Sequence, residues 1–135
     1  MSTLFSSVIS FAIYFFGALA ALVIFKFVYS LVTPQDEWKL IKENKNTAAA
    51  IGLGGSTLGF AIALSGAITN SVSLIDFVTW AFIALVAQTL AFAIVRFVFM
   101  PGIVLRIKNG ELSAGIILGA VSVSVGLLNA ACMTY

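Results

Sequence analysis

The chain has 135 residues, of which 61% are hydrophobic and 9% are charged, and its mean hydropathy is +1.15. Soluble domains carry roughly 25% charged residues, so this composition argues against an ordinary soluble fold. The net charge of +2 is too small and too clustered for nucleic-acid binding. With no histidine and one cysteine, Cys132, we expect no metal site, no cofactor, no catalytic residue and no enzymatic activity.

Four apolar segments follow one another along the chain, near residues 5–32, 47–70, 75–99 and 112–134. Each is long enough to cross about 30 Å of hydrocarbon, which takes roughly 20 helical residues. We therefore predict an all-α polytopic membrane protein in which residues 1–135 form a single membrane domain with four transmembrane helices.

The connections between these segments differ in charge. Residues 33–46 carry Lys39, Lys42 and Lys45, residues 100–111 carry Arg106 and Lys108, and the middle connection has no basic residue. Lys26 and Arg96 lie near span ends that adjoin the two basic connections. All seven Lys and Arg residues then fall on one side, which the positive-inside rule makes cytoplasmic. We expect both termini outside and the 33–46 and 100–111 loops on the cytoplasmic side of the membrane.

The first loop carries the residues expected to anchor the chain at the interface. Glu37 and Trp38 follow Pro34, with Lys42 one turn further along. Tryptophan favours head-group depth and lysine favours lipid phosphates. We interpret this as an interfacial anchor, and residues 35–45 are also a candidate docking site for a soluble partner.

Small residues recur along the second and fourth segments. Two G-x-x-x-G patterns occur, at Gly55 with Gly59 and at Gly115 with Gly119. Small residues on one face let helix backbones approach closely in lipid. We predict that these two helices form the packing core through Gly52, Gly55, Gly59, Gly115, Gly119 and Gly126. The Phe-rich first and third segments are expected to face acyl chains.

The two halves of the chain, 5–70 and 75–134, resemble each other. Lys26-Phe27-Val28-Tyr29, Pro34 and Ala49-Ala50-Ile51 are echoed by Arg96-Phe97-Val98-Phe99, Pro101 and Ala114-Gly115-Ile116. Because each half contains two spans, both enter the membrane in the same direction. The pattern predicts two parallel two-helix repeats, although apolar helices also resemble one another by composition.

Polar side chains inside the spans are candidate transport groups because they are costly in hydrocarbon. Gln88, Asn129, Tyr14 and Ser56 are the main ones. Serine hydroxyls often bond back to their own helix, so a structural role for Ser56 stays open. An amide side chain cannot satisfy itself in that way, which makes Gln88 and Asn129 stronger candidates.

Two carboxylates, Asp76 and Glu111, each stand at the start of a span. A carboxylate at a helix N-terminus is stabilised by the helix dipole, so one interpretation is that both are capping residues. The other is that they gate opposite mouths of a pathway, concentrating cations or exchanging protons, with Arg96 as the inner partner of Glu111.

Several short stretches carry a family resemblance. They are Thr33-Pro34, Glu37-Trp38 with Leu40-Ile41-Lys42, Asn46-Thr47-Ala48-Ala49 and the ending Asn129-Ala130-Ala131-Cys132-Met133-Thr134-Tyr135. In these the chain resembles the YjfL family of small bacterial inner-membrane proteins, a domain of unknown function. The resemblance covers nearly the whole chain and implies four spans in two tandem two-span units. It implies no catalytic residues.

Two functional hypotheses follow. In the first, the protein is an ion-conducting or proton-coupled transport unit. Four helices enclose too little space for a pathway, so the protein would act as a homo-oligomer, with a dimer favoured. A monovalent cation or a proton would be the cargo. In the second, it is a non-transporting membrane scaffold that docks other membrane or stress-response proteins.

Overall fold

The computed structural model describes residues 2–33 and 37–133. Residues 35 and 36 of the candidate docking loop and residue 134 of the last predicted span lie outside these ranges. The described residues form α1 (Ser2–Val32), α2 (Glu37–Lys42), α3 (Thr47–Asn70), α4 (Leu74–Ile94), the π-helical turn η1 (Val95–Phe99), α5 (Ile103–Lys108) and α6 (Leu112–Cys132), with no strand among them. Four of the helical stretches are long and apolar enough to cross a membrane, which confirms the predicted all-α class with four spans.

Local chemistry explains where these helices begin and end. The side chain of Asn46 accepts a hydrogen bond of 3.0 Å from the backbone N–H of Ala49, which caps the start of α3. The third span ends in η1 at Phe99, two residues before Pro101. A proline disfavours helical geometry in the residue before it, and Met100 accordingly has a non-helical backbone, with its N–H bonded 2.7 Å from the Val95 carbonyl oxygen.

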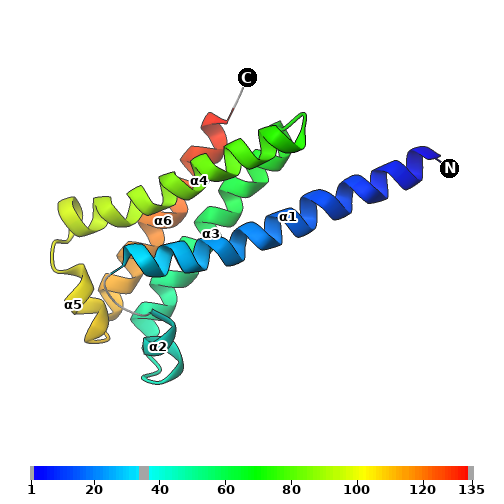
Figure 1. Cartoon of the computed structure of the whole chain (residues 1–135). Coiled ribbons are helices and arrows are strands. Elements are labelled where there is room, and N and C mark those ends of the chain that lie inside the picture. Colours follow the sequence, from blue (N-terminus) through cyan, green and yellow to red (C-terminus); the bar gives the residue numbers. More distant parts are fainter. Residues whose placement is uncertain (1, 34–36, 134–135) are drawn as a thin grey trace.

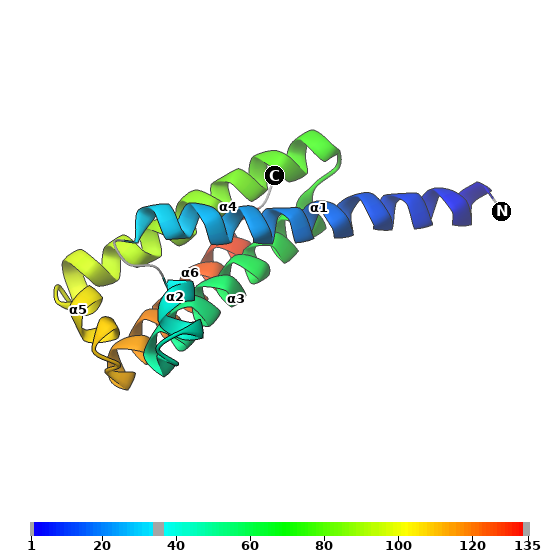
Figure 2. The same ribbon diagram turned by 60° about the horizontal axis from the view of Figure 1, so that its bottom comes forward.

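The long helices lie in two layers, with α1 and α4 across the pair formed by α3 and α6 (Figures 1 and 2). The α3 and α6 backbones touch, since a Cβ on Gly55 would lie 2.8 Å from the Gly119 carbonyl oxygen. A Cβ on Gly126 would lie 2.6 Å from Gly59 Cα, and one on Gly115 would lie 2.7 Å from Ala48 Cα. Glycine is therefore required along this crossing because any side chain would push the two helices apart.

The two ends of the bundle differ in charge. The short helices α2 and α5 both lie at one end, which we call the basic end because Lys39, Lys42, Arg106 and Lys108 lie on them (Figure 1). The α3–α4 turn and the C-terminal end of α6 lie at the opposite end. The N-terminal part of α1 extends past the other helices in both views and exposes large apolar side chains, among them Leu4, Phe5 and Phe11.

Candidate functional site

Four polar side chains, one from each long helix, meet inside the bundle. They are Tyr29 of α1, Ser56 of α3, Gln88 of α4 and Ser122 of α6, and all four are buried. We call them the polar junction. Ser56 is the tenth residue of α3 and Ser122 the eleventh of α6. At 1.5 Å per residue both lie about 15 Å from their helix starts, near the middle of a hydrocarbon core of about 30 Å.

Three hydroxyl groups form a continuous chain in the junction. The Ser56 Oγ lies 3.1 Å from the Tyr29 hydroxyl oxygen, 3.1 Å from the Ser122 Oγ and 2.9 Å from the Gly52 carbonyl oxygen. A hydroxyl carries one proton, so Ser56 donates to one of these oxygens and can accept from the neighbouring hydroxyls. Rotation of the hydroxyl groups can therefore reverse the direction of these hydrogen bonds without moving any heavy atom.

Gln88 closes the junction from α4. Its Nε2 donates to the backbone carbonyls of Ser56 and Ser122, at 3.2 Å each, and so joins α4 to both core helices. Gly59 leaves the room that this amide needs, because a Cβ there would lie 2.6 Å from Nε2. The amide oxygen Oε1 is buried and has no hydrogen-bond partner among the described residues. An unpaired buried polar atom costs about 1–3 kcal/mol.

A second unpaired amide lies further along α6. The Nδ2 atom of Asn129 is buried without a partner in the described part of the chain. Asn129 follows Ser122 by seven residues, which is about two turns, so it lies on the same helix face roughly 10 Å closer to the end opposite the basic end. Gln88 and Asn129, the two strongest polar candidates from the sequence, thus both retain unused hydrogen-bonding capacity.

Glu37 places a carboxyl group on the side of the polar junction that faces the basic end of the bundle. It begins α2, its side chain is only 4% exposed, and it lies close enough to Tyr29 to interact with it electrostatically. Trp38, by contrast, is 41% exposed, and Lys42 is also exposed. Of the three residues expected at the interface, Glu37 therefore faces the protein interior.

The two carboxylates at the span starts lie apart from the junction. Asp76 takes part in a reciprocal cap of α4, since its N–H donates to Ser73 Oγ at 3.2 Å and its Oδ2 accepts from the Val72 N–H at 3.3 Å. Glu111 lies at the N-cap of α6, but its side chain makes no capping bond. Its carboxylate pairs with Arg106 instead.

The expected pairing of Glu111 with Arg96 is wrong. Arg106 holds both carboxylate oxygens of Glu111, at 2.7 Å from Nη2 and 2.8 Å from Nε. Gly110, with φ of 77°, turns the chain back so that residues five apart face each other. The hydrogen bonds from Arg106 lower the pKa of Glu111 below its ordinary value. Arg96 instead lies with its guanidinium carbon 5.4 Å from the centre of the Phe97 ring.

Tyr14 also lies outside the junction. Its ring packs edge-on against Phe77, with 5.5 Å between ring centres, at the contact of α1 with α4. Of the seven transport candidates taken from the sequence, only Ser56 and Gln88 therefore meet in the polar junction.

Sequence reasoning missed three residues that organise this region. The sequence shows Tyr29 only as part of the repeat and Ser122 only as a serine inside an apolar span. The available signal was the helical spacing of Ser122 from Gly115, Gly119 and Gly126, which puts it on the packing face. Asn46 was also missed. Its Nδ2 donates 2.7 Å to the Ile107 carbonyl oxygen and so joins the start of α3 to α5.

Comparison with known proteins gives a consistent family. Residues 3–133 match the family described as Domain of Unknown Function (DUF350). The chain is 46% identical to the UPF0719 inner membrane protein YjfL of Escherichia coli (strain K12), over 96% of each chain. It is 28% identical to the UPF0719 transmembrane protein YshE of Bacillus subtilis (strain 168), over 93% of this chain and 94% of that one. No solved structure gives a significant match.

Proposed function

We propose that this chain, which belongs to the DUF350 family of membrane proteins, is a non-enzymatic ion-conducting or proton-coupled transport unit of the inner membrane. The observation that carries the proposal is the polar junction in the middle of the apolar bundle. Polar groups at that depth are costly and by default functional. A junction that served packing alone would have its amide atoms satisfied, whereas Gln88 Oε1 has no partner among the described residues.

The unpaired amide atoms support a transient ligand at the junction. Most buried polar atoms in proteins are hydrogen-bonded, and an exception calls for an explanation. An amide oxygen is a hard ligand for a monovalent cation and an acceptor for water. A water, a cation or a hydrated proton that passes the junction supplies the partner that Gln88 Oε1 lacks.

The order of polar groups along the bundle supports a route across it. From the basic end the groups are the Glu37 carboxyl, the Tyr29, Ser56 and Ser122 hydroxyls, the Gln88 amide and then Asn129. Glu37 interacts electrostatically with Tyr29 at the start of the hydroxyl chain, so it is the proton-exchanging group we propose in place of Glu111. We keep Asp76 as a candidate at the opposite mouth.

A homo-oligomer, with a dimer favoured, is part of the proposal. In a single chain the polar junction is buried, and four helices can surround only a narrow route. A dimer surrounds the route with more helices. The exposed apolar part of α1 beyond the bundle gives a second copy a surface to pack against (Figure 2). We further propose, from the basic end, that the α2 and α5 loops face the cytoplasm and both termini face outward.

Flux through proteoliposomes that contain only the purified protein tests the proposal. Internal pH and membrane potential are followed with dyes under H⁺, K⁺ and Na⁺ gradients, for wild type, Gln88→Leu, Glu37→Gln and Asp76→Asn. Thr89→Val is the matched control, because Thr89 is the neighbour of Gln88 and its hydroxyl bonds back to the Val86 carbonyl at 2.8 Å. Wild-type and control flux above empty liposomes, lost in Gln88→Leu, supports a conduit. No flux under any gradient refutes it.

The second candidate is a membrane scaffold. The projecting part of α1 favours it, because a helix with apolar side chains and few neighbours in its own chain is suited to packing against another membrane protein. Residues 35–45 would then hold a soluble partner. A scaffold keeps its function in Gln88→Leu and loses it when α1 is altered, for instance in Phe11→Ser, which is the reverse of what a conduit does.

A further inference from the structure

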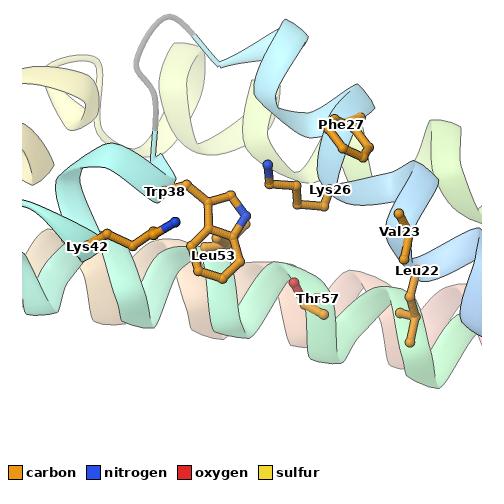
Figure 3. Close-up of a pocket in the computed structure, with 8 residues that line it drawn as sticks. All are labelled: Leu22, Val23, Lys26, Phe27, Trp38, Lys42, Leu53 and Thr57. Carbon is orange, nitrogen blue, oxygen red and sulfur yellow. The ribbon is translucent and has the colours of Figure 1, made fainter.

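A groove runs along the outside of the bundle between α1 and α3, and the helix α2 closes one end of it. At that end lies a cavity of about 520 Å³ whose lining includes Lys26 and Phe27 of α1, Trp38 and Lys42 of α2, and Leu53 and Thr57 of α3 (Figure 3). It combines two ammonium groups and two aromatic side chains with aliphatic residues, and none of the residues that line it is acidic.

The groove continues away from the basic end as an apolar hollow of about 310 Å³. Leu22 lines both cavities, so the two lie end to end. On α3 the lining positions are 53, 57, 61, 64, 65, 68 and 69, which follow one face of the helix. On α1 they run from 27 back to 15 and also follow one face. One face of each helix therefore forms a continuous wall, which is basic at one end and mainly apolar beyond it, with Ser65 and Thr69 as its polar residues there.

The basic end of the groove is organised around Trp38. The Lys26 Nζ lies 5.6 Å from the centre of the Trp38 ring and 4.6 Å from that of Phe27, so two aromatic faces hold this ammonium group. The Lys42 side chain also points toward Trp38, from α2 (Figure 3). Lys26 and Lys42 are not part of the ion pair between Arg106 and Glu111.

We propose that this groove binds one anionic glycerophospholipid from the leaflet at the basic end. The lipid phosphate lies between the ammonium groups of Lys26 and Lys42, and an acyl chain passes Thr57 and follows the α1–α3 wall past Leu22. Charge complementarity favours this occupant. A helix of a second copy would bury both lysines against apolar side chains, which is costly without a counter-charge.

This site does not depend on transport. The groove lies on the outside of the bundle and shares no residue with the polar junction, so it is occupied whether the protein is a conduit or a scaffold. Its test therefore measures lipid binding and leaves flux aside.

Trp38 fluorescence reports the site directly. The chain has two tryptophans, so Trp80→Phe leaves Trp38 as the only emitter. The protein is placed in nanodiscs of phosphatidylcholine that contain the same small fraction of either brominated phosphatidylglycerol or brominated phosphatidylcholine, and quenching is compared. The test variant is Lys26→Gln/Lys42→Gln. The matched control is Lys45→Gln/Lys108→Gln, which removes the same charge from exposed positions outside the groove.

The proposal predicts stronger quenching by brominated phosphatidylglycerol, with a preference over phosphatidylcholine on the order of tenfold for two basic contacts. That preference is kept in the control and lost in Lys26→Gln/Lys42→Gln. Equal quenching by the two lipids overturns the site. An equal loss of the preference in both double variants also overturns it, because the preference would then come from the general surface charge. Native mass spectrometry of the chain with Trp80 intact provides an independent measurement. A retained phosphatidylglycerol adduct supports the site, and equal retention of both lipids overturns it.

Discussion

The close crossing of α3 and α6 can be tested with two neighbouring glycines that differ only in what surrounds them. A Cβ on Gly55 would lie 2.8 Å from the Gly119 carbonyl oxygen, whereas ordinary contact begins at 3.4 Å. The atoms that it meets belong to the backbone, so the helices must separate by more than half an ångström. A Cβ on Gly54 would have nothing within 4 Å. The pair Gly55→Ala and Gly54→Ala therefore adds the same methyl group to a filled and to an open position.

The expected difference between them follows from two effects. Overpacking a close contact costs typically about 1–3 kcal/mol. Separating the helices also stretches the 3.1 Å contact between Ser56 and Ser122 and the two bonds from Gln88, and intramembrane hydrogen bonds are worth about 0.6 kcal/mol each. We expect Gly55→Ala to be destabilised by about 2–4 kcal/mol. Gly54→Ala is expected to be neutral or stabilised by up to about 1 kcal/mol, because alanine restricts the unfolded chain.

Reversible unfolding in mixed micelles with increasing sodium dodecyl sulfate, followed by circular dichroism, measures both variants. A free energy of unfolding for Gly55→Ala within about 0.5 kcal/mol of that for Gly54→Ala would refute backbone contact between α3 and α6, since surface changes stay in that range.

The remaining predictions concern other parts of the chain. Asn46→Ala removes both the α3 cap and the bond to the Ile107 carbonyl, so it should lower the free energy of unfolding by about 1–3 kcal/mol, while the exposed Asn44→Ala stays near wild type. Because the pKa of Glu111 is lowered in the folded state, its ion pair with Arg106 stabilises the fold above the unfolded-state pKa and stops doing so as pH falls through the folded-state value. The pair is exposed, so unfolding curves of Glu111→Gln should differ little from wild type at neutral pH and should lose that acid dependence. Tyr29→Phe interrupts the hydroxyl chain and should reduce flux, whereas Tyr14→Phe keeps its ring contact with Phe77 and should not. Equal flux in these two variants would remove Tyr29 from the proposed route.

The spans were predictable from the sequence because their lengths and apolar composition leave few alternatives in lipid. The side-chain pairings were harder. Glu111 pairs with Arg106 and not Arg96 because of the turn at Gly110, whose left-handed backbone was not evident from composition. Tyr29 lies near the end of α1, where a tyrosine is expected at the interface, yet its side chain reaches Ser56 inside the bundle. Such contacts depend on how the helices cross, which one-dimensional periodicity does not determine.

The internal repeat remains a prediction, and its register in the core helices differs from the one that the sequence favoured. Matching Ala49-Ala50-Ile51 with Ala114-Gly115-Ile116 implies a shift of 65 positions. The buried residues Ala48, Gly52 and Ser56 of α3 correspond in burial to Ala114, Leu118 and Ser122 of α6, which is a shift of 66. Which residues are buried depends on the face of the helix that packs inward. The similarity between two stretches of small residues is only a loose guide to that face.

The most direct test of the proposed function is the initial rate of ion flux through Gln88→Leu, with the folded fraction measured on the same proteoliposomes. The substitution removes two hydrogen bonds, worth about 1 kcal/mol together, so the protein should stay folded and assembled. A conduit through the polar junction predicts that the rate falls to that of empty liposomes while Thr89→Val matches wild type. A Gln88→Leu rate equal to that of wild type would contradict a route through this junction.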